Sequence, residues 1–366
     1  MAGLAELADL VKRFAREAGF ELAGIAPVAD FPELVYFPEW IAQGRAAEMK
    51  YLESRNDAGE LKRASLRTTV PWARSVIVCA INYNSAQPYS TQVGDPERGW
   101  ISRYAWSRED YHDAVMRRLR RIEQRLIEKA RTEQHPHAAS PDSTPPLQTR
   151  CYVDTGPVVE RVFAKYAGVG WIGKNTCILN QKMGSWLFLG VILTSWELTP
   201  DLPAPDRCGS CRRCIEACPT GAFPAPYQLD SNKCIAYLTI EKRGPIPDEM
   251  RDGLGRHVFG CDICQDVCPW NRKAPPSEAP EFQPRPGLVN PALEWLAGMD
   301  EAQFREAFHG SAVRRAKLSG LRRNAVVAMG NSGNRAFIPL LEILCEDGDA
   351  MVAEHARWAA EKLERS

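Results

Sequence analysis

Two sets of four cysteines constrain this chain more than any other feature of its sequence. The first set has the spacing C-x2-C-x2-C-x3-C-P and consists of Cys208, Cys211, Cys214 and Cys218. The second set ends in C-x2-C-x3-C-P and consists of Cys234, Cys261, Cys264 and Cys268. Structural zinc sites present isolated C-x2-C pairs, whereas runs that end in C-x3-C-P are typical of bacterial ferredoxins. The spacing therefore predicts two 4Fe–4S clusters, which transfer electrons one at a time.

The order of the cysteines also predicts which of them share a cluster. In two-cluster ferredoxins the fourth cysteine of a run binds the cluster of the other run. We therefore expect one cluster on Cys208, Cys211, Cys214 and Cys268. The other is expected on Cys218, Cys234, Cys261 and Cys264. The second set departs from the usual spacing because 26 residues, 235–260, separate its first two members.

The chain is too long to be a ferredoxin alone. It has 366 residues, 45% of them hydrophobic, which predicts two or three domains. Basic and acidic residues balance at 46 each, which argues against a general polyanion binder and leaves room for a local basic patch. Twelve cysteines, an amphipathic N-terminal segment and no apolar run of about 20 residues predict a cytoplasmic metalloprotein without a membrane span.

Hydrophobic patterning and proline content predict three domains. Residues 1–200 are expected to form an α/β (α+β) domain. Its expected strands lie at 22–25, 75–83, 151–154 and 185–196, its helices at the N-terminus, 111–131 and 158–167, and a Pro- and Ser-rich loop at 132–148. Proline-rich linkers at 198–208 and 273–287 bound a ferredoxin-like domain over 201–285. Residues 286–366 are expected to be helical.

The C-terminal segment contains a short internal repeat. LRRNAVVAM and VAEHARWAA align with an offset of 31 residues. The matched pairs are Leu321 with Val352, Ala325 with Ala356, and Ala328 with Ala359. A repeat of this length in a helical segment indicates a HEAT-like pair of helices.

Two motif matches are rejected on their context. GVGWIG at 168–173 fits G-x-G-x-x-G, and its extension to Asn175 nearly fits the phosphate loop. A dinucleotide site needs a strand before the glycines, whereas a helical segment precedes them here, and Asn175 lacks the hydroxyl that binds magnesium. DYHDAV at 110–115 begins like the cobalt-ligating D-x-H-x-x-G signature, but Val115 replaces its glycine. His112 is therefore not expected to bind cobalt.

Several stretches together resemble the iron–sulfur, cobalamin-dependent epoxyqueuosine reductases. They are RYAWSREDYH (103–112), CYVDTGPVVERVFAKYAGVGWIGKNTCIL (151–179) and CIAYLTIEKRG (234–244), together with the two cysteine sets. The resemblance covers nearly the whole chain, and DTGPVVER with GWIGKNT is its most specific part. It implies a cobalamin-binding domain related to that of reductive dehalogenases, followed by the ferredoxin-like domain and the helical HEAT-like domain.

The resemblance implies the last step of queuosine synthesis on RNA. In that step the epoxide on the cyclopentane ring of the modified base is reduced to an alkene, and water is released. The implied substrate is the wobble base of tRNAs with GUN anticodons, which accept Tyr, His, Asn and Asp. The implied cofactors are two 4Fe–4S clusters and a base-off cobalamin without a histidine ligand. We further expect a monomer that receives electrons from an external low-potential donor.

Asp154 in VDTGP matches the proton donor of the family. Removal of an epoxide oxygen takes two electrons and two protons, because oxide is a poor leaving group unless it is protonated. An acid above the cobalt would supply a proton if a desolvated pocket raised its pKa. On the residues alone, Asp154 could equally serve only to stabilise the D-T-G-P turn. The resemblance favours the catalytic role.

The resemblance also implies which residues contact cobalamin. They are Arg103, Tyr104, Asp154, Lys174, Asn175, Cys177 and Ile178. Amides of the glycine-rich turn would hold the amide side chains of the corrin. One position departs from the family: Ala236 stands where members often carry serine in the stretch CISYLTIE, which removes a hydroxyl contact there.

Local charge predicts a contact with tRNA. The expected phosphate-binding residues are Lys242, Arg243, Arg314, Arg315, Lys317, Arg322 and Arg323. No acidic residue interrupts the stretch from Arg314 to Arg323. Such cations bind phosphates without reading the base sequence, while a base splayed out of its stack would enter the active site.

Two other functions remain as alternatives. A cobalamin-dependent reductase of a small substrate, like a reductive dehalogenase, would usually carry an export signal and would not need the helical C-terminal segment. A ferredoxin-type electron carrier would need neither Asp154 nor a separate domain over 1–200. Binding of cobalamin with micromolar affinity or better would argue against the carrier.

Overall fold

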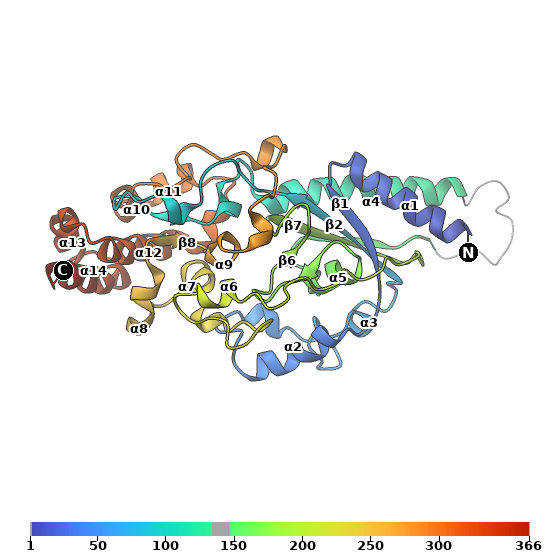
Figure 1. Ribbon diagram of the computed structural model, residues 1–366, viewed down its shortest axis with the longest axis horizontal. Helices are drawn as coiled ribbons and strands as arrows, with labels where there is room; N and C mark the ends of the chain where they lie inside the picture. Colours follow the sequence, from blue (N-terminus) through green and yellow to red (C-terminus); the bar gives the residue numbers. More distant parts are fainter. Residues whose placement is uncertain (1, 134–145, 366) are drawn as a thin grey trace. The chain divides into compact units, whose positions relative to one another are not determined.

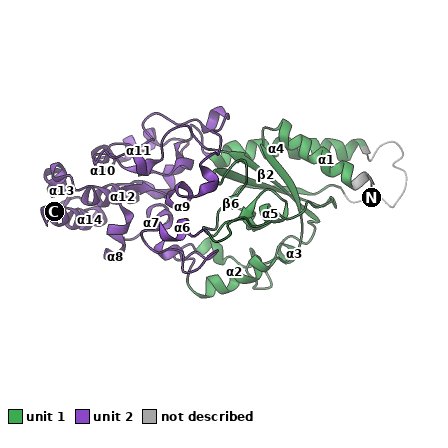
Figure 2. Cartoon of the chain, viewed as in Figure 1, with its two compact units in different colours: residues 1–44, 50–82, 111–210 green, residues 45–49, 83–110, 211–366 purple. Residues whose placement is uncertain are grey.

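A computed structural model describes residues 2–133 and 146–365 of the chain. The chain divides into two compact units (Figure 2). Unit 1 comprises Met1–Gly44, Lys50–Asn82 and Tyr111–Ser210, and unit 2 comprises Arg45–Met49, Tyr83–Asp110 and Cys211–Ser366. The expected loop at 132–148 lies mostly outside the described residues. One boundary between the units falls inside the first cysteine set, and the division into three domains stays a prediction.

Unit 1 is built on a four-stranded antiparallel sheet (Figure 1). Its strands, in spatial order, are β1 (Leu22–Pro27), β2 (Ser75–Asn82), β7 (Leu187–Thr194) and β4 (Thr149–Tyr152). Val78 in the middle of β2 pairs with Gly24 of β1 and Val191 of β7. Each expected strand has a counterpart, but the third lies two residues earlier than expected, so that Asp154 falls beyond the strand. The antiparallel pairing makes unit 1 an α+β fold. All eight residues of β2 are buried, because both faces of the sheet are covered.

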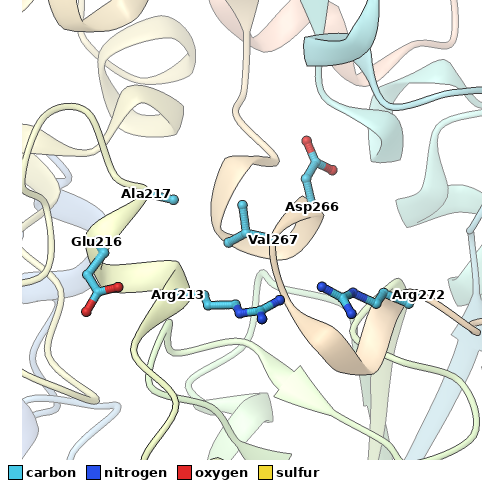
Figure 3. A pocket seen from close by; sticks show the side chains of 6 residues that line it. All are labelled: Arg213, Glu216, Ala217, Asp266, Val267 and Arg272. Carbon is cyan, nitrogen blue, oxygen red and sulfur yellow. The ribbon is translucent and has the colours of Figure 1, made fainter.

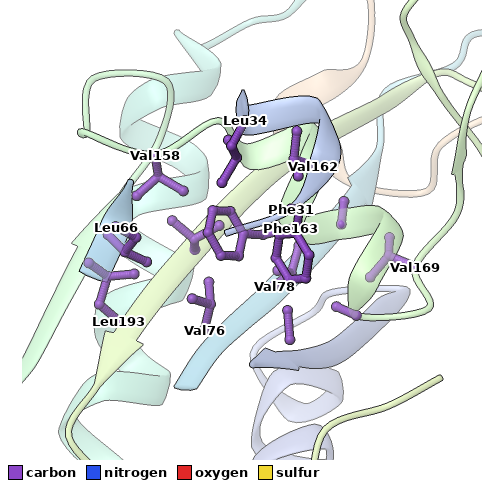
Figure 4. Packing of buried hydrophobic residues seen from close by; sticks show 14 of the residues in the cluster. Phe31, Leu34, Leu66, Val76, Val78, Val158, Val162, Phe163, Val169 and Leu193 are labelled. Atoms are coloured by element: carbon purple, nitrogen blue, oxygen red, sulfur yellow. The ribbon is translucent and has the colours of Figure 1, made fainter. Parts of the chain in front are cut away.

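Helices cover the two faces of this sheet. Helices α1 (Ala2–Glu17) and α4 (Tyr111–Glu133) pack on one face, where Gly190 of β7 lets α4 approach: a Cβ there would lie 2.8 Å from the Leu119 side chain. The other face carries the cluster of Figure 4, in which Val76, Val78 and Phe163 meet. That cluster is covered by α2 (Pro32–Ala42), α3 (Leu66–Thr69) and α5 (Glu160–Tyr166). Side chains alternate along a strand, so Val76 and Val78 share one face.

The glycine-rich stretch forms a hairpin in unit 1. Strands β5 (Trp171–Ile172) and β6 (Ile178–Leu179) pair antiparallel. The turn closes through a hydrogen bond from the Gly173 N–H to the Cys177 carbonyl, 2.8 Å long, and Thr176 adopts a φ of 64°. Helix α5 precedes this stretch and a strand follows it, which is the reverse of the arrangement that a dinucleotide site needs.

Unit 2 contains short elements around the cysteines and a group of helices at its C-terminal end (Figure 1). Strands β3 (Trp100–Ile101) and β8 (His257–Phe259) pair in parallel. The short helices are α6 (Arg213–Glu216), α7 (Ile235–Ile240), α8 (Asp248–Arg251) and α9 (Ile263–Asp266). They are followed by α10 (Leu293–Ala297), α11 (Glu301–Ala307), α12 (Lys317–Asn331), α13 (Ile338–Leu344) and α14 (Ala350–Arg365). Among the described residues, no helix has the length and apolar character needed to cross a membrane.

Helices α12 and α14 pack closely against each other. Gly330 of α12 lies so near Ala359 of α14 that a Cβ would be 2.9 Å from it. All six residues of the aligned repeat are fully buried, so the offset of 31 residues reflects equivalent core positions in the two helices. The amide of Asn324 joins α12 to the cysteine-bearing part of unit 2, because it donates to the carbonyls of Thr239 (2.8 Å) and Val258 (2.9 Å). The HEAT-like assignment stays a prediction.

Candidate functional site

Asp154 lies on an open loop directly after β4. Its φ is 57°, in the left-handed region that aspartate tolerates better than most residues, and its side chain is 54% exposed. The Tyr111 hydroxyl donates a hydrogen bond to Asp154 Oδ2, and His112 Nε2 lies 3.9 Å from the same oxygen. The Arg63 guanidinium donates to the main-chain carbonyls of Asp154 (3.1 Å) and Gly156 (3.0 Å). The loop is thus fixed while its carboxyl group stays accessible.

Glu160 is a second carboxyl group near this loop. It is the first residue of α5, and its Oε1 is buried without a hydrogen-bond partner in the described part of the chain. Burial and, after it, the negative charge of Asp154 raise the pKa of Glu160 to about 7, against the opposing effects of Arg63 and Arg161. Sequence reasoning missed this residue. Its signal was a second acid six positions after Asp154 in DTGPVVER.

The hairpin turn gathers four of the predicted cobalamin contacts. Lys174 Nζ donates to the Gly209 carbonyl at 2.5 Å, which fixes the turn to the residue after Cys208. Asn175 is buried, and its Oδ1 accepts from the Cys177 N–H at 3.3 Å. Arg161, next to Glu160, donates to the Thr176 carbonyl at 2.8 Å. The start of α5 therefore connects the Asp154 loop to the hairpin.

Ile178 and Arg103 differ from the other predicted contacts because their side chains are buried. Ile178 belongs to the apolar cluster of unit 1, which leaves only its main chain for a ligand. In unit 2, the Arg103 guanidinium is 3% exposed and donates to Asn84 Oδ1 (3.1 Å) and to the Ser85 and Gln87 carbonyls (2.5 and 2.9 Å). The Arg103 guanidinium therefore holds the loop 84–87, and the contact of this residue with cobalamin stays a prediction.

Tyr104 follows Arg103 and is less enclosed. It is half-buried, and its ring centroid lies 5.9 Å from that of Phe259 in β8. The N–H of Arg103 and the hydroxyl of Ser102 both donate to the Asp262 carboxylate, which fixes this segment beside Cys261. Tyr104 therefore lies on a stretch of unit 2 that is anchored to the second cysteine set.

The cysteines of unit 2 come together around short helices. Cys214 lies in α6 and Cys264 in α9, and these helices contact each other. Burial raises the pKa of the Cys261 thiol, and the nearby thiol groups of Cys234 and Cys218 raise it further. Three members of the predicted second cluster are therefore neighbours. Because iron binds the deprotonated thiolate, metal binding has to overcome this raised pKa.

The donor set suits iron–sulfur clusters better than a single metal ion. Within residues 2–133 and 146–365, no three His, Cys, Asp or Glu side chains are arranged to hold one ion. A 4Fe–4S cluster differs because each of its cysteines binds a different iron. None of the twelve cysteines forms a disulfide, which leaves all eight members of the two sets available as thiolates. These residues fit two clusters.

The predicted tRNA-binding cations have different surroundings. Arg323 is fully buried, and its guanidinium donates to the carbonyls of Lys242 (3.0 Å), Gly244 (2.6 Å) and Leu238 (2.8 Å). Its other two N–H groups donate to Asn324 Oδ1 at 3.1 and 2.8 Å, so all five guanidinium donors are used inside the unit and none is left for a phosphate. The prediction of a tRNA contact is therefore wrong for Arg323.

Three of the other cations form close pairs with acids. Arg315 donates to both carboxylate oxygens of Asp110 at 3.1 Å, Arg322 pairs with Asp347 at 2.5 Å, and Lys242 pairs with Glu48. Each pairing neutralises a charge that would otherwise attract phosphate.

The remaining cations form what we call the 243/314/317 surface. Arg314 and Lys317 are exposed, and Arg243 is half exposed and lies 3.8 Å from Glu241 Oε2. Arg243 donates to the Arg315 carbonyl at 2.9 Å, which places it next to Arg314. Arg314 and Lys317 therefore retain the charge that the sequence predicted for phosphate binding, while Glu241 offsets part of the charge of Arg243.

Comparison with known proteins identifies a family whose members resemble this chain. Residues 63–155, which include Asp154 and the Arg63 that holds its loop, match the family model "Epoxyqueuosine reductase QueG, DUF1730". Residues 207–271 match the family model "4Fe-4S double cluster binding domain", which confirms the double-cluster domain predicted from the cysteine spacing. The epoxyqueuosine reductase of Synechocystis sp. is 44% identical over 307 residues, which are 82% of this chain and 98% of the relative.

Solved structures agree over almost the whole chain. An epoxyqueuosine reductase crystallised with an epoxyqueuosine-modified tRNA-Tyr stem loop is similar, with a TM-score of 0.83, 29% identity and coverage of 98% of this chain and 90% of that one. The Bacillus subtilis epoxyqueuosine reductase, in a structure with its catalytic aspartate loop swung out of the active site, has the same TM-score, identity and coverage.

Proposed function

The chain belongs to the epoxyqueuosine reductase family, and on this premise we propose that it reduces epoxyqueuosine to queuosine at the wobble base of tRNAs with GUN anticodons. The observation that carries the proposal is the Asp154 loop, in which an accessible carboxyl group is held by Tyr111 and Arg63 within the segment that matches the family model. As a member of this family with a double 4Fe–4S domain, the protein is an iron–sulfur oxidoreductase.

Proton delivery is the task that we assign to the residues of unit 1. The reaction converts an epoxide, two electrons and two protons into an alkene and water. Asp154 would protonate the epoxide oxygen as its carbon–oxygen bond breaks, because an unprotonated oxide leaves poorly. Tyr111 would orient the carboxyl group, and Arg63 would hold its main chain. The relative whose catalytic aspartate loop swings out of its active site supports a similar role for the exposed Asp154 loop.

Both protons of the reaction end on the same oxygen atom. A single carboxyl group at that oxygen must therefore be reprotonated before the second transfer. Glu160 suits this role because its pKa of about 7 keeps a proton available near neutrality, and because burial beside the Asp154 charge is what raises that pKa. We therefore assign Glu160 as the buried proton reserve of Asp154.

The cofactors are assigned to the residues that fit them. The clusters supply electrons one at a time, and Cys208, Cys211, Cys214, Cys268 would hold one while Cys218, Cys234, Cys261, Cys264 hold the other. Bound base-off, without a histidine ligand, cobalamin would supply a strongly reducing cobalt centre. The turn of Lys174, Asn175, Cys177 and Ile178, together with Tyr104 and Asp154, would hold it. The polar main-chain groups of that turn suit corrin amides, whereas the buried Arg103 side chain does not.

The partner proposed for unit 2 is the anticodon arm of tRNA. The 243/314/317 surface would bind phosphates, and the base would be splayed out for reaction. The crystallised relative with a modified tRNA stem loop supports this partner. We also retain as proposals the three-domain division, the HEAT-like C-terminal pair, a relation to the cobalamin domain of reductive dehalogenases, a monomeric state and a cytoplasmic location.

The direct test is anaerobic incubation of the reconstituted protein with cobalamin, a reductant and tRNA bearing epoxyqueuosine. We expect queuosine in the recovered nucleosides, and its absence would reject the function in favour of a small-substrate reductase or an electron carrier. Asp154→Asn should lower the rate by about 10²- to 10⁴-fold, the usual contribution of a general acid. Asp113→Asn, which changes an exposed acid at the start of α4, is the matched control and should keep the wild-type rate.

A further inference from the structure

A pocket of about 470 Å³ opens on unit 2 between α6 and α9 (Figure 3). It is lined by Arg213, Glu216, Ala217, Asp266, Val267 and Arg272. The guanidinium groups of Arg213 and Arg272 point toward each other across its rim. Both arginines are exposed, and within the described residues neither guanidinium has a hydrogen-bond or ion-pair partner. Two like charges that face each other and are not paired favour the binding of an anionic group.

The pocket lies beside ligands of one predicted cluster. Arg213 directly precedes Cys214, and Val267 directly precedes Cys268. These two cysteines were assigned to the same cluster from the spacing rule, and the helices that carry Arg213 and precede Val267 contact each other. A partner seated in this pocket would therefore be close to one cluster. Electron transfer needs such closeness, because its rate falls steeply with distance.

The surroundings of the pocket add further positive charge. Arg212 and Lys273 are exposed next to the two rim arginines. The acids are fewer: Glu216 lies 3.7 Å from Arg212, and Asp266 accepts a hydrogen bond from Thr91. The lining itself balances two arginines against two acids, and Arg212 and Lys273 next to it bring the local total to four basic and two acidic side chains. The complementary partner is acidic.

We propose that this basic pocket is the docking site of the external electron donor, an acidic one-electron carrier protein. The inference rests on the proposed function, because only an external donor can supply the two electrons of each turnover. Two donor molecules would dock in succession and each give up one electron, which the cluster held by Cys214 and Cys268 would accept, while the two protons come through Asp154. Such redox encounters bury little surface, so steering by charge contributes much of their rate.

The test measures reduction of the clusters separately from queuosine formation. The holoprotein is mixed anaerobically with reduced flavodoxin, an acidic probe, and the loss of cluster absorbance is followed by stopped flow. The double variant Arg213→Glu/Arg272→Glu should be reduced at least about tenfold more slowly at low salt, within the range that electrostatic steering supplies. High salt should shrink the difference, because it screens exposed charges. Reduced methyl viologen, a small cation, should reduce both proteins at similar rates.

Two further variants isolate the docking role. Arg305→Glu/Arg335→Glu reverses two exposed arginines elsewhere in unit 2 and should leave reduction by flavodoxin unchanged. Arg213→Gln/Arg272→Gln removes charge without adding acid. It should slow the reduction of the clusters by flavodoxin less than the glutamate pair does, while preserving the clusters. Binding of flavodoxin, measured by titration calorimetry, should weaken in the same order.

Three results would overturn the docking site, and a fourth would separate it from the enzymatic function. Unchanged reduction by flavodoxin in the glutamate variant overturns the proposal, and so does equal slowing with methyl viologen, which would mean damaged clusters. A loss of tRNA affinity with unchanged flavodoxin kinetics assigns the pocket to RNA and also overturns it. If the wild type forms no queuosine yet its clusters accept electrons from flavodoxin in an arginine-dependent way, the enzymatic function fails and the docking site stands.

Discussion

The sheet of unit 1 and the cysteine segment of unit 2 are ordered by different forces. In β2 all eight side chains are buried, whereas over residues 211–234 only Ala222 and Ser231 are. Full burial of a valine or isoleucine contributes about 1.5–3 kcal/mol, so the sheet can be held together by its own side chains. The cysteine segment lacks that contribution. We expect ligation of the clusters by its cysteines to supply much of its order, as in small domains that fold only with their metal.

Removal of iron gives the largest expected effect and tests this difference directly. Anaerobic treatment with a chelator and a reductant should abolish queuosine formation, because no electrons reach the active site. Hydrogen exchange should become much faster at the amides of 211–234 and stay slow in β2 and β7. Rebuilding the clusters with iron and sulfide should restore both activity and protection. Equal loss of protection in the sheet and the segment would contradict the comparison.

Gly24→Val tests whether close side-chain packing holds the sheet of unit 1 together. A Cβ at Gly24 in β1 would overlap the carbonyl oxygen of Ala167 at the end of α5, and neither strand nor helix can move without opening the core. We expect a loss of about 3 kcal/mol or more in the free energy of unfolding, at the upper end of overpacking effects. Urea unfolding followed by tryptophan fluorescence measures it.

A matched glycine substitution controls for backbone effects. A Cβ added to Gly94 in unit 2 would meet no atom within 4 Å, so Gly94→Ala should change stability by less than about 1 kcal/mol. If both variants unfold alike, close packing of β1 on α5 does not limit the stability of unit 1.

The contrast between the two regions also explains what the sequence could predict. Strands β2 and β7 are continuous apolar runs, and helix α4 has a regular apolar face, so period and length alone located them. The cluster cysteines could be predicted for another reason, because the spacing of ligands along the sequence indicates the kind of cluster they bind. Both kinds of signal are local.

The errors concern side chains whose role depends on distant parts of the chain. Arg323 is an ordinary cation in the sequence, and only the fold reveals that carbonyls brought from elsewhere satisfy its guanidinium group. Glu160 was missed because its raised pKa comes from burial beside Asp154, which no spacing records. Charge is visible in a sequence, whereas solvent exposure of that charge is a property of packing.

Glu160→Gln tests whether the raised pKa of Glu160, at the start of α5 near the Asp154 loop, affects stability and catalysis. The pKa of Glu160 rises from its usual value of 4.5 to about 7 on folding, so the folded state favours the protonated form. The contribution of Glu160 to the free energy of unfolding is then largest below pH 4.5 and falls as the pH rises toward 7. The loss is up to about 3 kcal/mol, at roughly 1.4 kcal/mol per pKa unit. Glutamine does not ionise, so the variant should lose less stability between pH 5 and pH 8.

Unfolding by urea at several pH values measures that difference. Glu128→Gln, an exposed glutamate of α4, is the control and should follow the wild type. The rate of queuosine formation supplies a second readout that a purely structural role would not change: the wild-type rate should decline above about pH 7 as the proton reserve empties, and the variant should lose that limb of the profile. A wild-type pH profile in the Glu160 variant would reject its proton role.

The smallest expected effect separates exposed from paired cations within unit 2. Arg314→Ala/Lys317→Ala removes two exposed charges of the 243/314/317 surface, and tRNA affinity should fall by about three- to tenfold. The slope of log affinity against log salt concentration should decrease by about two, one for each lost phosphate contact. Arg322→Ala should leave the slope unchanged and lower stability, because it strands the Asp347 carboxylate that Arg322 now pairs with. Filter binding over a range of salt concentrations measures the slopes, and equal slopes for the wild type and the double variant would show that the exposed pair does not contact phosphate.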